Sequence, residues 1–474
     1  MDTVGAQPAS LAGGGIGEPV TAEDLLLKRG ARLLHIGPHK TGTSAIQGAL
    51  HAARERLAAA GVIYPGRGRQ TLWPILAITG QPALLGEPRP NIAHWDLLVQ
   101  AVAAAGDQRV VLSSEFFAET QDSVIPRVVS ELGGERVHVV VTLRPLWKIM
   151  PSQWQQYVQN GFRMPYGEWL AGILRQPPKT PTPGFWRRHR HDDLVGRWAA
   201  VAGPQNVTVV VVDESDRTML LRTFEAMLGL PDRFLALADD VANRSLTLAE
   251  TEIVRRLNQE FKLREWPDGN YPKFMRYGAV QQMKSSRQPG PDEARITTPG
   301  WAVERATEIA AEMADNIKGI GVRVVGDLGT LSELPPALIG PVAGTGPALP
   351  LQPAAADDGP TASPSMALIT PQALAGLRPG HPDAPPKPAR SRKPAVTAPL
   401  PSPDQLAAQA DAPLPLVPAD AAVHAIVGAF LAGGVTAATV ADRLSDVGGR
   451  AMTKALVRRI RQRALTRLRP SAEK

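Results

Sequence analysis

A strand, a tight loop and a helix follow one another between residues 32 and 50, in the sequence RLLHIGPHKTGTSAIQGAL. The apolar residues Leu33, Leu34 and Ile36 predict a short buried strand, and helical spacing begins at Thr43. The loop between them has glycines at positions 37 and 42. A helix start leaves backbone N–H groups without partners at the positive end of the helix dipole. The stretch therefore predicts a cradle for a phosphate-like anion.

The side chains of this loop add further donors for an anion. The candidate anion-binding residues are Lys40, Thr41, Gly42, Thr43 and Ser44. Lysine contributes a point charge, and the hydroxyls contribute short donors. The loop is not a complete Walker A motif, because His39 stands where that motif has a glycine before its lysine. This difference argues against ordinary nucleoside triphosphate hydrolysis. The alternative is a plain turn with a solvated lysine.

A second motif spans residues 137 to 156, VHVVVTLRPLWKIMPSQWQQ. Its β-branched start predicts a buried parallel strand, followed by a helix. Arg144 stands at the end of the strand, and Ser152 lies eight positions further on in the helix. A guanidinium can donate two hydrogen bonds to a phosphate and a hydroxyl can donate one more, so both side chains are of a kind that can bind phosphate. A surface ion pair is the alternative for Arg144 alone.

The sequence PHKTGTS resembles the 5′-phosphosulfate loop of sulfotransferases, the enzymes that use 3′-phosphoadenosine 5′-phosphosulfate (PAPS). Arg144 and Ser152 resemble the pair that holds the 3′-phosphate of PAPS in that family. The resemblance covers roughly residues 30 to 330. It implies an α/β fold, with a parallel sheet flanked by helices as in P-loop nucleoside triphosphate hydrolases. It also implies PAPS as the donor, no metal, and in-line transfer to a hydroxyl of a carbohydrate, glycolipid or small metabolite.

Two residues are candidates for the general base that accepts the proton of the acceptor hydroxyl. Glu115 follows a predicted strand at residues 110 to 112, at the edge where ligands gather in an open α/β sheet. A carboxylate that stabilises a helix start is an equally good interpretation. His39, beside Lys40, is the second candidate. His35 on the first strand fits a core histidine better.

Further basic residues follow the predicted helix at residues 243 to 258. Ser245 or Thr247 is expected to cap this helix, with Glu250 as the partner of Thr247. Arg244 and Ser245 are weak candidates for nucleotide contact. The segment after the helix is expected to be irregular, and so is the Pro- and Gly-rich stretch from 64 to 90. The basic residues of the irregular segment are Lys273, Arg276, Lys284 and Arg287.

Composition divides the chain into four parts. Residues 1–28 are expected to be a flexible lead-in, and 29–335 the catalytic domain. Residues 336–420 are rich in Pro and Ala and predict a disordered linker. Residues 421–474 contain ten Lys or Arg against three Asp or Glu and predict a basic module with helices at 423–431, 436–444 and 453–468. Three kinds of partner are compatible with this module, namely a protein, a nucleic acid or an anionic lipid.

The whole sequence sets broader expectations. The net charge of +7 is compatible with an anionic donor, and the absence of cysteine excludes disulfides and thiolate chemistry. No apolar run is long enough for a spanning helix and the start lacks a secretory pattern, so a cytoplasmic protein is expected.

Two other functions stay open. One is a P-loop kinase or NTPase, and the other is a non-catalytic nucleotide-binding regulator with a nucleic-acid-binding tail.

Overall fold

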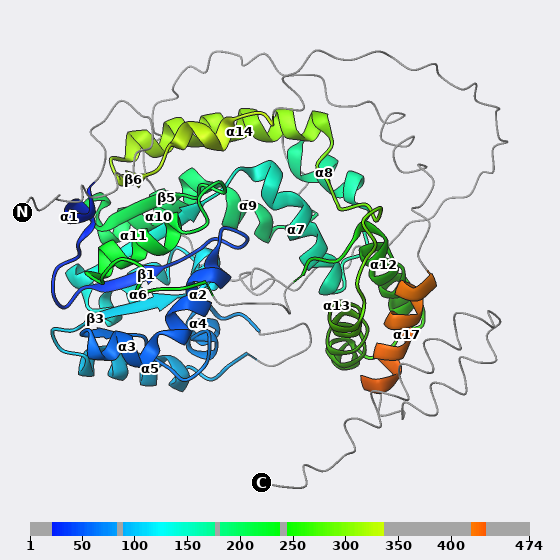
Figure 1. Ribbon diagram of the computed structural model, residues 1–474, viewed down its shortest axis with the longest axis horizontal. Helices are drawn as coiled ribbons and strands as arrows, with labels where there is room; N and C mark the ends of the chain where they lie inside the picture. The colour runs from blue at the N-terminus through cyan, green and yellow to red at the C-terminus, as the bar shows by residue number, and fades with distance from the viewer. Residues whose placement is uncertain (1–20, 83–88, 176–180, 238–243, 336–418, 433–474) are drawn as a thin grey trace, which may run out of the picture. The chain divides into compact units, whose positions relative to one another are not determined.

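A parallel sheet lies at the centre of the protein (Figure 1). The computed structural model describes residues 21–82, 89–175, 181–237, 244–335 and 419–432. Within these ranges, six strands pair in the order β2-β3-β1-β4-β5-β6, and every pair is parallel. The strands are β1 (Arg32–His35), β2 (Val62–Ile63), β3 (Arg109–Ser113), β4 (Val137–Leu143), β5 (Val207–Val211) and β6 (Arg323–Val325).

Helices cover the sheet and continue beyond it (Figure 1). The α-helices are α1 (Ala22–Leu25), α2 (Thr43–Ala52), α3 (Arg54–Ala59), α4 (Leu72–Thr79), α5 (Ala93–Ala104), α6 (Ile125–Leu132), α7 (Leu146–Gln159), α8 (Tyr166–Leu174), α9 (Gly184–His189), α10 (His191–Ala202), α11 (Met219–Leu228), α12 (Leu248–Leu263), α13 (Gln281–Ser286), α14 (Gly300–Ile320) and α17 (Ala419–Ala432). Short 3₁₀ helices are η1 (Glu115–Glu119), η2 (Gly134–Arg136), η3 (Pro204–Asn206), η4 (Asp268–Asn270) and η6 (Leu328–Ser332), and η5 (Pro272–Val280) is a π-helix.

Successive residues of each strand enter two different hydrophobic cores, because side chains alternate between the faces of a sheet. Leu33, with its neighbours on β3 and β4, packs in a core with residues of α2, α3 and α11. Leu34 and its neighbours pack in a larger core with residues of α6, α7, α10 and α14. Burial on both faces explains why the strands are runs of β-branched residues. The predicted α/β fold, a parallel sheet flanked by helices, is confirmed.

The strand order brings the carboxyl ends of three strands together. Strand β1 lies between β3 and β4, so that Leu34 pairs with Leu112 on one side and with Val139 on the other. The chain passes from β1 towards the β2 edge, and after β3 it crosses to the other side of β1. In open α/β sheets, ligands bind at such a reversal, outside the carboxyl ends of the strands. The loop of the first motif follows β1 at this edge, and Arg144 of the second motif follows β4 there.

Two stretches that were expected to be irregular contain helices. Helix α4 lies in the segment from 64 to 90, of which residues 83–88 are outside the described part. Pro74 is tolerated because it falls in the first turn, where backbone N–H groups have no partner within the helix. Ile75, Leu76 and Ile78 bury the apolar side of α4. The second stretch, after α12, forms η5 and α13.

The other sequence expectations fall only partly in the described ranges. Helix α17 contains the helix predicted at 423–431 and starts inside the predicted linker, and it packs against η5, α13 and α12. The helices predicted at 436–444 and 453–468, nearly all of the predicted linker, and most of the predicted lead-in lie outside the described residues. The boundary near residue 335 stays a prediction. No helix in the described ranges is both long and apolar enough to cross a bilayer.

Helix α12 begins with a capping box at Thr247. The Thr247 hydroxyl accepts a hydrogen bond from the backbone N–H of Glu250 at 3.2 Å. The Glu250 carboxylate accepts one from the N–H of Thr247 at 2.9 Å. Two backbone donors that have no partner within the helix are thereby satisfied. Of the two caps that the sequence suggested, Thr247 and not Ser245 is the cap.

We predict that Thr247→Ala lowers the free energy of unfolding by about 1 kcal/mol, since it removes one half of this box. The matched control is Ser245→Ala, an exposed position two residues earlier. It should change the stability by less than about 0.5 kcal/mol. Urea unfolding followed by circular dichroism measures both variants. Equal losses in the two variants would contradict the assignment of the cap.

Candidate functional site

The anion-binding loop predicted at residues 37 to 44 follows β1 at the centre of the sheet. Gly37 has φ +81°, and a Cβ added there would lie 2.9 Å from the Cα of Glu115. Lys40 has φ +69°, in the left-handed region that side chains rarely adopt. Such a conformation costs about 1–3 kcal/mol and persists only where the surroundings impose it, which is common at functional sites.

A chain of buried hydrogen bonds imposes this loop shape. The His35 ring bonds Ser113 Oγ on β3 at 2.9 Å and Thr142 Oγ1 on β4 at 3.1 Å. Thr142 Oγ1 lies 2.7 Å from Thr41 Oγ1, which donates to the Pro38 carbonyl at 2.7 Å. Burial lowers the pKa of His35 to about 3, so its ring is neutral. His35 is therefore a structural residue that ties the loop to two strands.

The start of α2 faces outward at the end of this loop. Gly42 is the N-cap, and no side chain caps the helix. Gly42 and Ser44 are exposed, whereas Thr41 and Thr43 are buried. The Thr43 hydroxyl lies 3.5 Å from the Pro38 carbonyl. The hydroxyls of Thr41 and Thr43 thus brace the loop, which leaves backbone N–H groups and Ser44 on the outer side.

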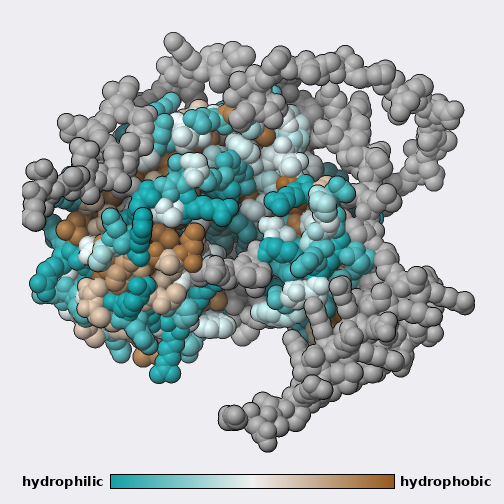
Figure 2. Space-filling view, in the orientation of Figure 1, coloured by the Kyte–Doolittle hydropathy of each residue, from teal (hydrophilic) through white to brown (hydrophobic). Residues whose placement is uncertain are grey.

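Lys40 is half-buried, and two other positive charges act on it. Burial, together with the charges of Lys284 and Arg276, lowers the pKa of Lys40 to about 8, while Glu115 acts in the opposite direction. Lys284 lies on α13 and Arg276 on η5, so both come from the segment after α12. The visible surface over α12 and α13 is mostly hydrophilic (Figure 2). Positive charges that disfavour one another in this way would be stabilised by a bound anion.

Arg144 extends from the end of β4 towards the loop. Its guanidinium donates to the Lys40 carbonyl at 3.5 Å and pairs with Glu214, which also accepts from Lys148 at 2.8 Å. The Ser152 hydroxyl donates to the Ile149 carbonyl of its own helix at 2.9 Å. The structure therefore brings Arg144 to the predicted loop, where its guanidinium pairs with the Glu214 carboxylate.

Glu115 begins η1, directly after β3. It is half-buried, and its carboxylate accepts a hydrogen bond from Gln47 of α2 at 3.0 Å. Ser114, and not Glu115, caps the short helix, through a bond from the N–H of Phe116. The carboxylate is close enough to Lys40 to act on its pKa. Glu115 and Lys40, which are 75 positions apart in the sequence, are therefore neighbours in the site.

His39 belongs to a chain of buried and half-buried polar groups that joins the loop to α7 and α9. Its Nε2 lies 3.0 Å from the Glu119 carboxylate, which pairs with Arg188 at 3.0 Å. Arg188 also bonds the Tyr157 hydroxyl at 3.3 Å. Burial alone would raise the pKa of Glu119, but Arg188 and His39 outweigh it and lower this pKa to about 2. The carboxylate is therefore ionised and holds the orientation of the His39 ring.

The remaining basic candidates have several different environments. Arg244 and Arg287 both pair with the buried carboxylate of Glu250, so neither extends towards the loop. Lys273 lies over the ring of Phe274. His189 and His191 are buried, and no group of three or more possible metal ligands occurs in the ranges that the structure describes.

Sequence reasoning missed three carboxamide or carboxylate groups that hold the candidates in place: Gln47, Glu119 and Glu214. Each is 68 to 80 positions away from the candidate residue that it contacts. The basic stretch WRRHRHDD provided the only signal, because it contains Arg188. Its side chain meets Glu119 and Tyr157 inside the protein.

Comparison with known proteins gives one structural likeness. No protein-family model matches the sequence, and no curated protein sequence matches it either. A crystal structure of a sulfotransferase from Alicyclobacillus acidocaldarius aligns with 62% of this chain and 96% of its own, at 15% sequence identity. The TM-score is 0.35. A superposition at this level is no argument for a function, so the assignment depends on the site itself.

Proposed function

We propose that the protein is a sulfotransferase that moves a sulfuryl group from PAPS to a hydroxyl of a carbohydrate, a glycolipid or a small metabolite. The observation that supports this most is the setting of Lys40. It has a left-handed backbone at an uncapped helix start, and Lys284 and Arg276 act on it as further positive charges. Backbone donors and converging cations fit a polyanionic donor.

The two phosphate ends of PAPS would meet different residues. Lys40, the N–H groups at the start of α2 and the exposed hydroxyl of Ser44 would hold the 5′-phosphosulfate. Arg144 and Ser152 would hold the 3′-phosphate, as the family resemblance implies. Arg144 would then exchange the Glu214 carboxylate for the phosphate, and the Ser152 hydroxyl would turn away from the Ile149 carbonyl.

Transfer needs one bond to form and one to break. The oxygen of the acceptor attacks sulfur while the bond from sulfur to the bridging 5′-phosphate oxygen breaks. The products are a sulfate ester and 3′-phosphoadenosine 5′-phosphate (PAP), and the acceptor proton passes to a base. Lys40 would neutralise the charge that develops on the leaving phosphate. Most of the rate enhancement would come from positioning and fixed charge.

We assign the base to Glu115 and a positioning role to His39. A base must contact the acceptor, and Glu115 is half-buried beside Lys40, where Gln47 orients its carboxylate. His39 is only 4% exposed, and the ionised Glu119 holds its ring. His39 would therefore stabilise the loop that contains Lys40 and act indirectly.

The first test measures nucleotide binding by calorimetry. We expect the protein to bind PAP more tightly than ADP, because only PAP has a 3′-phosphate for Arg144. Arg144→Ala should weaken PAP binding about 10- to 100-fold and leave ADP binding nearly unchanged. Arg127→Ala is the control, because Arg127 forms an exposed pair with Glu131 on α6. Equal binding of PAP and ADP by the unaltered protein would refute PAPS as the donor.

The affinity for PAP should fall above about pH 8, the pKa of Lys40 in the free protein. Below that pH Lys40 is already protonated, so the affinity is level. Above it, binding must take up a proton, and the affinity falls by up to about tenfold per pH unit. The phosphates of PAP are ionised by about pH 7 and add no slope there.

Lys40→Arg is the control for this pH dependence, since arginine stays charged throughout the range. The variant should lose most of the slope between pH 8 and about 10. Any slope that remains is expected from Lys284, whose pKa is also lowered, by burial and by the charges of Arg244 and Arg276. A wild-type affinity that stays level up to about pH 10 would exclude Lys40 from the anion site.

The base is tested by transfer of radiolabelled sulfur from PAPS to an acceptor found by screening carbohydrates, glycolipids and small hydroxylated metabolites. Glu115→Gln should lower kcat about 10²- to 10⁴-fold, the usual contribution of a general base, with little change in PAP affinity. His39→Gln should weaken PAP binding as well as lower kcat, since it loosens the loop. If the Glu115→Gln variant keeps the wild-type kcat, Glu115 is not the base and another residue accepts the proton.

A further inference from the structure

Helix α17 packs on the segment that contains the cations near Lys40. It contacts η5, α13 and α12, and Figure 1 shows it beside α12 and α13. We call residues 272–287 the cationic segment, which comprises η5, α13 and Arg287. Helix α17 starts 132 positions after this segment ends. A distant part of the chain therefore packs on the segment that contains these charges.

The backbones of α17 and η5 approach each other closely at Gly428 and Gly278. A Cβ added to Gly428 of α17 would lie 2.3 Å from the Gly278 carbonyl oxygen and 2.5 Å from the Cβ of Gln282. A Cβ added to Gly278 would lie 2.8 Å from the Gly428 carbonyl oxygen. Real Cβ atoms essentially never approach other atoms so closely. The helix can therefore dock in this position only with glycine at both sites.

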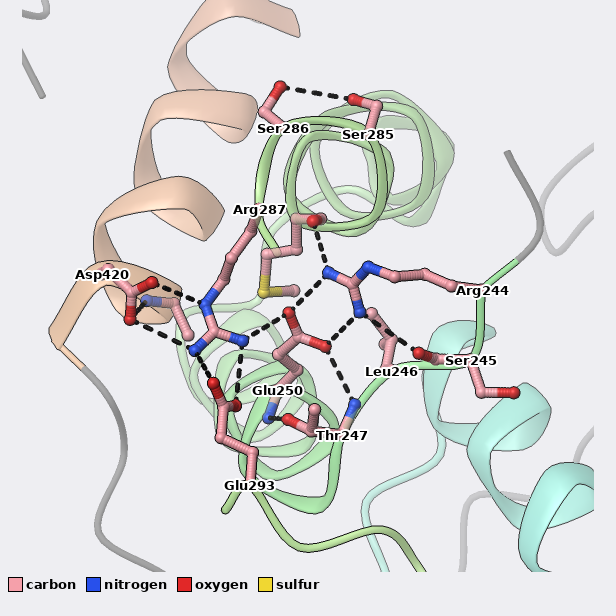
Figure 3. A network of polar contacts seen from close by, with 12 residues as sticks. Arg244, Ser245, Leu246, Thr247, Glu250, Ser285, Ser286, Arg287, Glu293 and Asp420 are labelled. Atoms are coloured by element: carbon pink, nitrogen blue, oxygen red, sulfur yellow. Dashed lines mark hydrogen bonds and ion pairs between the residues drawn. The ribbon is translucent and has the colours of Figure 1, made fainter. Parts of the chain in front are cut away.

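An ionic network joins the start of α17 to the end of the cationic segment (Figure 3). Arg287, whose side chain is 2% exposed, donates to Asp420 at 2.9 and 3.2 Å. It also pairs with Glu250 at 3.0 Å and with Glu293. These three carboxylates come from three separate parts of the sequence. A buried guanidinium needs such partners, so the network fixes the position of Arg287.

The cationic segment links this network to the anion site. Lys284 lies three residues before Arg287, and Arg276 lies in η5 beside Gly278. Arg244, which shares Glu250 with Arg287, donates to the Met283 carbonyl at 2.6 Å, immediately before Lys284. The positive charges of Lys284 and Arg276 act on Lys40, as described above. Whatever holds α13 and η5 in place therefore also holds these charges beside the loop.

We propose that α17 is a clamp for the donor site. When it is docked through Gly428 and Asp420, it keeps Lys284 and Arg276 near Lys40 and so strengthens the binding of the anionic donor. Gly428 and Asp420 are positioning residues, since they act through the cationic segment and do not touch the donor. This inference depends on the proposed function, because it requires an anion at Lys40.

The test measures PAP affinity for the full-length chain. Gly428→Ala should displace α17 and weaken PAP binding about tenfold, since charges held in place are lost from the site. Gly319→Ala is the matched control. Gly319 is also helical, and a Cβ added there would meet no atom within 4 Å. Circular dichroism should show that both variants keep the folded core. Wild-type affinity in a folded Gly428→Ala variant would overturn the clamp.

Two further measurements distinguish a clamp from a general loss of structure. In a background with both Lys284→Ala and Arg276→Ala, Gly428→Ala should change the affinity by less than about twofold, because the two charges that α17 positions are already gone. An undiminished effect there would refute the route through Lys284 and Arg276. Asp420→Asn should weaken PAP binding in the same direction, and Asp420→Glu should restore it. A wild-type chain that binds no PAP would refute the proposed function itself, and the clamp with it.

Discussion

The hydrogen bonds of His35 hold together the part of the protein on which the candidate site depends. One ring nitrogen reaches Ser113 of β3 and the other reaches Thr142 of β4, and Thr142 in turn meets Thr41 of the loop. A neutral buried imidazole can satisfy two neighbours only when both lie at the correct distance. The ring therefore fixes the spacing of three strand ends, and with it the place where the loop leaves the sheet.

The charges that act on Lys40 distinguish the candidate site from the other places where a cation is buried. Inside most proteins a buried cation has a carboxylate beside it, as Arg287 and Arg188 do. Lys40 has the Glu115 carboxylate near it, but the positive charges of Lys284 and Arg276 also act on it, and with burial they lower its pKa to about 8. Such an arrangement lowers stability unless something else compensates, and its persistence is easiest to understand if a ligand supplies the missing negative charge.

The sequence predicted those parts of the fold that local patterns determine. The strands at residues 110–112 and 137–142 and the capping box at Thr247 were found because periodicity and capping act over a few residues. Helix α4 was missed because its Pro and Gly neighbours suggested a loop, although Pro74 occupies a tolerated position. At the site, local motifs indicated Lys40 and Arg144. The pairs Glu119 with His39 and Glu214 with Arg144 bring together residues 70 or more positions apart, which no local pattern encodes.

The pair of Arg287 and Asp420 has a consequence for the order in which the protein is made. These residues are 133 positions apart, so the ribosome completes the sheet and the cationic segment well before it reaches α17. At about 5–20 residues per second, this interval is roughly 7–27 s. During that time Arg287 has Glu250 within reach, and Glu293 soon after, and together these can satisfy its charge before Asp420 exists. A growing chain can thus bury this arginine early and add its last partner without rearranging the core.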